Sequence, residues 1–172
     1  RELRWQEMPT AAVPLDSTTY QPWYSPDEWA EMRLSSKSHW DVPVRVSNGT
    51  VLHVLASHPT PPGFDGVARR NARRNHDEIQ FWVDYLSGAP YIEDDSGRAG
   101  GLPRDASFAV MGDLNADPED PSAFRGAIRA LIGHERVNGA VVPTASPARR
   151  GQDTDLDPHD TSRWAARIDY VL

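Results

Sequence analysis

Apolar residues occur in short runs along this chain, and the spacing within each run predicts an element. Two valine-rich runs, residues 42–46 and 51–56, flank the tetrapeptide at residues 47–50. That tetrapeptide contains Asn48-Gly49, a pair that suits the tight type I′ turn. We therefore expect a β-hairpin over residues 42–56.

A helical period replaces this pattern in later stretches. Residues 68–87 and 121–132 carry apolar side chains three and four positions apart, and a glycine ends each stretch. A shorter helix is expected after Ser25, because serine caps a helix well and Pro26 suits its first position. The two apolar stripes are Ile79, Trp82, Val83 and Leu86, and Phe124, Ile128, Leu131 and Ile132.

Two further apolar runs, residues 107–111 and 168–172, predict strands. The resulting order, β-β-α-β-α-β, favours an α/β layered domain. Residues 1–40 are expected to be rich in loops, because four prolines interrupt any regular pattern there. We expect residues 1–172 to form one domain that is incomplete, since the last strand runs to Leu172 with no polar tail.

Composition narrows the function classes. The chain has 172 residues, 38% hydrophobic, a formal net charge of −7 and no cysteine. The absence of cysteine excludes disulfides, thiolate zinc sites and cysteine nucleophiles. The acidic balance argues against a broad basic surface for nucleic acid, although a local basic groove is compatible with it. No apolar run is long enough for a transmembrane helix, and the compartment stays open between export and the cytoplasm.

The segment Gly112-Asp113-Leu114-Asn115 follows the apolar run that ends at Met111. On an extended strand, Asp113 and Asn115 point to the same face. A carboxylate binds a hard cation or a water, and a carboxamide donates hydrogen bonds to a phosphoryl oxygen. The alternative is a plain turn, because Asp and Asn are both common in loops.

His58 follows the strand at residues 51–56 and precedes Pro59. A loop histidine is more often structural than catalytic. Its place at a strand end, where sites in α/β proteins gather, and its rigid proline neighbours favour a positioned general acid or phosphate donor.

Four arginines open the helix at residues 68–87, namely Arg69, Arg70, Arg73 and Arg74. The pairs four residues apart place like charges on the same side of the helix, where they repel unless an anion compensates. A solvated helix face is the alternative. The functional hypothesis takes Arg73, Arg74 and Asn75 as substrate-binding residues that meet a phosphate.

Asp169 lies between apolar residues on the last strand, which we expect to be largely buried. A buried carboxylate is costly unless it is paired. Its partner is either an arginine, Arg163 or Arg167, or a catalytic histidine whose tautomer it fixes. No histidine follows Asp169 in this chain.

Three of these segments together resemble the endonuclease/exonuclease/phosphatase superfamily, which includes deoxyribonucleases, sphingomyelinases and inositol polyphosphate 5-phosphatases. They are residues 112–118, residues 167–172 and Ser57-His58-Pro59, and they occur in the order of the family's motifs. The longer strings at residues 33–44 and 57–62 are similar to a bacterial branch of uncharacterised members. On that basis the resemblance covers nearly the whole chain.

The resemblance implies a four-layer α/β sandwich, with two mainly antiparallel sheets packed face to face and helices outside. It implies hydrolysis of a phosphoester with a divalent metal, usually Mg²⁺, with Mn²⁺ or Ca²⁺ as alternatives. By motif, Asp113 would orient or deprotonate the attacking water close to the metal. Asn115 would hold a phosphoryl oxygen, His58 would stabilise the phosphoryl charge, and Asp169 would orient a histidine.

Parts of the family pattern are missing from the sequence. The family opens with a strand that carries an Asn, continues with a Gln-Glu motif that binds the metal, and closes with Ser-Asp-His. Gln6-Glu7 matches the Gln-Glu letters without a preceding strand and makes Glu7 the candidate metal ligand; no closing motif follows Leu172. The chain is therefore expected to be the C-terminal half to two-thirds of a family member, weakly active or inactive by itself.

Two functions remain from this reasoning. The first is a metal-dependent phosphodiesterase, nuclease or phosphatase whose partner is a phosphoester substrate, with nucleic acid among the candidates. The second is a relic or binding module that keeps the fold without the chemistry. We expect no membrane span and a monomer. A serine hydrolase of the α/β class is disfavoured because the chain has no Gly-x-Ser-x-Gly elbow.

Overall fold

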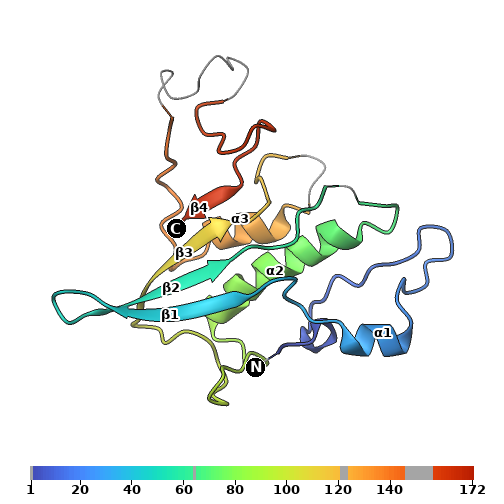
Figure 1. Ribbon diagram of the computed structural model, residues 1–172, viewed down its shortest axis with the longest axis horizontal. Coiled ribbons are helices and arrows are strands. Elements are labelled where there is room, and N and C mark those ends of the chain that lie inside the picture. The colour runs from blue at the N-terminus through green and yellow to red at the C-terminus, as the bar shows by residue number, and fades with distance from the viewer. Residues whose placement is uncertain (1, 64, 121–123, 146–156) are drawn as a thin grey trace.

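The computed structural model of the chain describes residues 2–63, 65–120, 124–145 and 157–172. In these residues four strands form one sheet in the order β1-β2-β3-β4 (Figure 1). The sheet and the helices make a mixed α/β structure, as the sequence predicts. The strands are β1 (His39–Arg45), β2 (Val51–Ser57), β3 (Ser107–Asp113) and β4 (Asp169–Val171).

Because of the strand directions, three chain segments lie together at one end of the sheet. β1 and β2 are an antiparallel hairpin, β2 and β3 run parallel, and β4 is antiparallel to β3. The parallel step requires a crossover, which a long helix provides. As a result, the C-terminal ends of β2 and β3 and the beginning of β4 lie together.

Helices cover one face of this sheet. The crossover helix α2 (Arg70–Ser87) packs beside the short α3 (Gly126–Ile132), as Figure 1 shows. Trp82 of α2 lies in the core with Leu55 of β2 and Val110 of β3. The predicted apolar stripe of α2 therefore faces the sheet. The indole N–H of Trp82 also donates a hydrogen bond to Ser57 Oγ at 2.8 Å, which fixes the helix against the end of β2.

The opposite face of the sheet is apolar and uncovered in the part of the chain that the structure describes. Side chains alternate along a strand, so Trp40, Val42 and Val44 of β1 share this face, and they are 62%, 44% and 41% exposed. Val171 of β4 is 72% exposed. The described residues form one sheet, so the second sheet of the predicted sandwich stays a prediction.

The N-terminal segment is loop-rich, as predicted, and forms a separate small core. Trp5, Met8 and Leu34 are fully buried there. This segment contains two short helices, η1 (Trp5–Glu7) and α1 (Pro26–Glu31). Ser25 caps α1 as expected, because its hydroxyl accepts a hydrogen bond from the Glu28 N–H while the Glu28 carboxylate accepts one from the Ser25 N–H.

Several boundaries differ from the prediction. β1 begins at His39 rather than at residue 42, and β3 extends through Asp113, because polar residues at the strand ends still pair with their neighbours. The predicted helix at residues 121–132 begins at Gly126, and residues 121–123 lie outside the described ones. Within the described residues, no helix is both long and apolar enough to cross a membrane.

Candidate functional site

His58, Asp113 and Asp169 line one pocket of about 590 Å³ at the end of the sheet where β2 and β3 end and β4 begins. His58 follows β2, Asp113 ends β3 and Asp169 begins β4, so the strand directions explain why they meet. His58 Nε2 lies 3.7 Å from Asp113 Oδ2, and both side chains are partly exposed to solvent. The predicted site residues of three separate segments thus form one cluster.

Asp113 and Asp169 are direct partners across the antiparallel pair of β3 and β4. Partners of this kind point to the same face, with their Cβ atoms about 5 Å apart. Like charges at such positions destabilise a sheet. A cation beside them would relieve the repulsion, so the position is suited to bind positive charge.

The prediction that Asp169 is buried is wrong. Asp169 is exposed, whereas its neighbour Tyr170 is buried and donates hydrogen bonds to the Ala116 and Arg167 carbonyl oxygens. The alternation of a strand with one covered face accounts for the difference, because Tyr170 takes the inward position. The Arg167 guanidinium lies 4.6 Å from the centre of the Tyr170 ring.

Asn115 connects the end of β3 to the His58 loop. Its backbone is left-handed, with φ of 50°, and its N–H donates to Asp113 Oδ1 at 2.9 Å. Its side-chain amide donates to the Pro59 carbonyl oxygen at 3.1 Å. The turn predicted from the sequence is therefore also the link that holds Asp113, Asn115 and the segment after His58 in one arrangement.

Gly112 allows β2 and β3 to approach closely at the site. A Cβ atom at this position would lie 2.1 Å from the Ser57 carbonyl oxygen, and the φ of Gly112 is +150°. Only glycine fits both conditions. The close approach brings the residue after Ser57, His58, next to the residue after Gly112, Asp113.

Two buried polar residues of α2, Asn75 and Glu78, bind the loops that follow His58 and Asp113. The Asn75 amide donates to the carbonyl oxygens of Thr60, Leu114 and Asn115 at 2.9, 2.9 and 3.3 Å. The Glu78 carboxylate accepts from the N–H groups of Thr60 at 2.6 Å and Ser36 at 2.5 Å. α2 therefore ties together the segments that carry His58 and Asn115.

Sequence reasoning missed Glu78 and Lys37. The signal for Glu78 was present, since a Glu four residues before Trp82 lies on the apolar stripe of the helix, where a charge needs partners. Lys37 carried no such signal. Its ammonium group donates to the His58 carbonyl oxygen at 3.0 Å, and it lines the pocket that contains His58.

The predicted substrate-binding residues differ in their surroundings. Arg74 donates to the carbonyl oxygens of Arg33 and Leu34, and Asn75 holds the site loops. The guanidinium of Arg73 lies 5.2 Å from the centre of the Phe124 ring. Arg74 and Asn75 thus have structural partners, and the prediction that the three residues bind substrate stays a prediction.

Glu7, the predicted metal ligand, lies outside this pocket. Its carboxylate accepts a hydrogen bond from the Arg4 N–H at 2.7 Å and closes the short helix η1. Among the residues that the structure describes, no group of three or more histidine and carboxylate side chains is arranged to hold a metal ion. The metal ligands expected from the sequence, Asp113 and Glu7, therefore stay a prediction.

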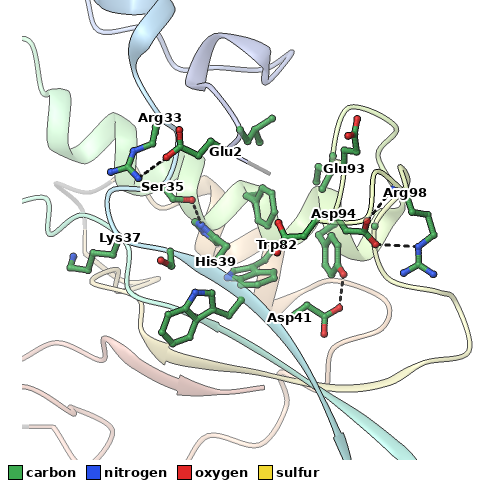
Figure 2. Close-up of a pocket in the computed structure, with 18 residues that line it drawn as sticks. Glu2, Arg33, Ser35, Lys37, His39, Asp41, Trp82, Glu93, Asp94 and Arg98 are labelled. Atoms are coloured by element: carbon green, nitrogen blue, oxygen red, sulfur yellow. Dashed lines mark hydrogen bonds and ion pairs between the residues drawn. The ribbon is translucent and has the colours of Figure 1, made fainter.

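A second pocket, of about 500 Å³, lies on the other side of β1 (Figure 2). It shares Lys37, Ser38 and Trp40 with the first pocket. At its centre His39 is hydrogen-bonded to Ser35 Oγ and to the Glu78 carbonyl oxygen. Burial lowers the pKa of His39, although the Glu78 charge acts in the opposite direction. Both ring nitrogens of His39 thus have protein partners, which indicates a structural role.

Comparison with known proteins assigns the family. The model of the endonuclease/exonuclease/phosphatase family matches residues 3–172, so the chain belongs to this family. No curated protein matches significantly. Among solved structures, sphingomyelinase C from Streptomyces griseocarneus is similar, with 20% identity and a TM-score of 0.42. The match covers 86% of this chain and 44% of the enzyme, so the chain spans less than half of that protein's length.

Proposed function

We propose that this chain carries the hydrolytic site of a divalent-metal-dependent phosphoesterase. Family membership supports a phosphoester hydrolase as the general class. The observation that carries the proposal is the meeting of His58 and Asp113, 3.7 Å apart, in a pocket that also contains Asp169. A partly exposed acid and base pair at a sheet edge is the arrangement that proton transfer to and from a bound substrate requires.

In this proposal each side chain has one task. The Asp113 carboxylate orients the attacking water and accepts its proton. As the water oxygen forms a bond to phosphorus, the ester P–O bond breaks, and a proton returns to the leaving oxygen. His58 and the Asn115 amide donate hydrogen bonds to the phosphoryl oxygens, where negative charge accumulates. Asp169 orients a histidine.

The proposed reaction includes a divalent metal ion. Mg²⁺ is the cation that the family resemblance implies, with Mn²⁺ and Ca²⁺ as alternatives, and it would supply charge stabilisation at the phosphoryl group. The repulsion between Asp113 and Asp169 supports a cation at this position. The described residues provide fewer than three grouped ligands for a metal ion. The roles of Asp113, Asn115 and His58 do not depend on the metal.

We also propose the four-layer sandwich for this chain. The support is the uncovered apolar face of the sheet, where Trp40, Val42, Val44 and Val171 are exposed. A contiguous apolar face of this kind ordinarily packs against another layer. A second sheet on this face would also close the pocket of His58 and Asp113 from one side.

Hydrolysis of two small substrates tests the proposal. Bis(p-nitrophenyl) phosphate reports diesterase activity and p-nitrophenyl phosphate reports monoesterase activity, each with Mg²⁺, Mn²⁺, Ca²⁺ or EDTA. We expect Asp113→Ala and Asn115→Ala each to lower kcat by roughly 100-fold or more. Asp105→Ala is the matched control, because Asp105 is exposed and lies just before the first residue of β3, at the end of that strand opposite to Asp113. Equal rates in all variants would refute the proposed site.

The second candidate is a binding module without catalysis. The incomplete donor set favours it, because a phosphoesterase that depends on a metal needs ligands beyond Asp113 and Asp169. This candidate predicts that neither substrate is hydrolysed with any of the metal ions, while a phosphate analogue such as vanadate still binds. The hydrolysis assay separates the two candidates, and isothermal titration with vanadate shows whether a chain without activity still binds a phosphate analogue.

A further inference from the structure

Lys37 is the only lysine in the 172-residue chain, and the other 17 basic residues are all arginines. The two side chains differ chemically, because an ammonium group is a compact point charge and a guanidinium group is a planar fork. Lys37 lines the pocket that contains His58, Asp113 and Asp169. The chain therefore places its one lysine ammonium group at the candidate site.

The charges around this pocket make a cation necessary for binding an anion there. Two carboxylates line the pocket, those of Asp113 and Asp169, and Lys37 is the only lysine or arginine among its described lining residues. A phosphoester carries at least one negative charge, which both carboxylates repel. Lys37 supplies a positive charge that offsets part of this repulsion.

The ammonium group of Lys37 is held beside His58 and keeps donors for a ligand. It donates one hydrogen bond, to the His58 carbonyl oxygen at 3.0 Å, and none of the ion pairs among the described residues includes it. An ammonium group has three N–H donors. The preceding residue, Ser36, is fixed by its hydrogen bonds to the buried Glu78 carboxylate. The charge is thus positioned by the backbone around it.

Lys37 lies at the boundary between the two pockets, and its hydrogen bond assigns it to the pocket of His58. In Figure 2 its side chain points away from Trp82, which lines the second pocket. In that pocket Asp94 already pairs with Arg98 at 3.4 Å. The ammonium group is therefore directed to the side of the sheet end on which His58 and Asp113 meet.

We propose that Lys37 is a substrate-binding residue of the candidate site. Its ammonium group donates to a non-bridging oxygen of the phosphoryl group while it keeps its hydrogen bond to the His58 carbonyl oxygen. Such a charge-assisted hydrogen bond is stronger than one between neutral groups. The inference rests on the proposed function for the phosphoryl group at this position, whereas binding of phosphate does not require hydrolysis.

The single lysine allows a direct test on the unmutated chain. Reductive methylation with ¹³C-formaldehyde keeps the charge of the lysine and gives one lysine signal in the NMR spectrum, which Lys37→Gln assigns by its loss. Inorganic phosphate is then added in EDTA. We expect the Lys37 signal to shift and saturate, while the signal of the terminal amino group stays in place. An unmoved Lys37 signal, or equal shifts of both signals, would overturn the proposal.

Three variants test the same binding by isothermal titration with inorganic phosphate. Lys37→Gln keeps a hydrogen-bond donor and removes the charge, and we expect binding roughly tenfold weaker or more. Lys37→Arg restores the charge and should recover most of the affinity. Arg45→Gln is the matched control, because Arg45 is also an exposed cation that donates to a backbone carbonyl oxygen, that of Gly49, and it lies outside the pocket. Equal affinity in Lys37→Gln and Arg45→Gln would overturn the proposal.

Kinetics separate binding of the phosphoryl group from a purely structural role. A p-nitrophenyl phosphate dianion gains more from a cation than the bis(p-nitrophenyl) phosphate monoanion does. We expect Lys37→Gln to lower kcat/KM for the monoester at least roughly threefold more than for the diester. Equal losses on both substrates would indicate that Lys37 only supports the His58 loop and would overturn the proposal. Absence of hydrolysis with every metal would refute the proposed function, while a phosphate-dependent shift of the Lys37 signal would still support the binding role.

Discussion

The Glu78 carboxylate accepts a hydrogen bond from the Thr60 N–H at 2.6 Å, two residues beyond His58. The same carboxylate accepts from the N–H and the hydroxyl of Ser36, which precedes Lys37. One buried charge on α2 therefore fixes the two segments that bring His58 and Lys37 to the candidate site. Glu78 is 1% exposed, so water cannot replace these partners.

Glu78→Gln tests this relationship. The amide keeps one acceptor and loses the charge, so at least one of the three hydrogen bonds is weakened or lost. We expect the free energy of unfolding to fall by about 1–3 kcal/mol, as for the loss of a hydrogen bond to a buried charged group. Urea denaturation measures it, with the exposed Glu119→Gln as a control that should change stability by less than about 0.5 kcal/mol. Equal, small effects in both variants would contradict the role given to Glu78.

Asp113→Asn should separate activity from stability. Asparagine keeps an oxygen for the Asn115 N–H and removes the repulsion between Asp113 and Asp169. We therefore expect the melting temperature to stay equal or to rise while hydrolysis is lost, as for charges kept for function rather than for stability. Calorimetry and a rate assay on the same sample measure both. A marked loss of stability would indicate that Asp113 serves the fold instead.

His39 predicts a dependence of stability on pH. Burial holds the pKa of His39 below its ordinary value of 6.5, so between these two values the unfolded chain binds more protons than the folded one. The stability from neutral His39 is complete above pH 6.5 and is lost as the pH falls through the folded-state pKa. Urea denaturation from pH 8 to 5 measures this loss. In His39→Gln the dependence between about pH 6.5 and 5 should be weaker than in the wild type; an identical curve would exclude His39 as its source.

Gly112→Ala should damage the fold at the site. The added Cβ would lie 2.1 Å from the Ser57 carbonyl oxygen, so β2 and β3 must move apart, and the φ of +150° is strained for alanine. We expect a loss of more than about 1 kcal/mol in the free energy of unfolding. Gly63→Ala is the matched control, because nothing lies within 4 Å of its added Cβ. If the two substitutions behave alike in thermal denaturation, the close approach at Gly112 is not needed.

Local sequence patterns predict much of this fold. The Asn48-Gly49 turn, the stripe of α2 and the Ser25 cap all lie where local chemistry places them, because each depends on neighbours within a few residues. The strand directions then bring His58 and Asp113 together. The α/β pattern predicts this, because sites in such sheets lie at the carboxyl ends of the strands.

Other features depend on contacts far apart in the chain and could not be read locally. The exposure of Asp169 follows from which face of β4 the helices cover, and a three-residue strand gives no period from which to infer it. Lys37 bonds to the His58 carbonyl oxygen next to Ser36, which Glu78 binds from 42 positions further along the sequence. The polar interruptions of the α2 stripe, Asn75 and Glu78, were visible in the sequence, but their partners were not.

A double-mutant cycle on His58 and Asp113 tests the central claim most directly. The kcat for bis(p-nitrophenyl) phosphate is measured for the wild type, His58→Asn, Asp113→Asn and the double variant, under the metal condition that gives the highest wild-type rate. Residues that act as a unit lose activity non-additively. We predict that each single variant loses roughly 100-fold or more and that the double variant is little worse than the poorer single one. Unchanged rates in the single variants, or losses that multiply fully in the double variant, would contradict a shared hydrolytic site.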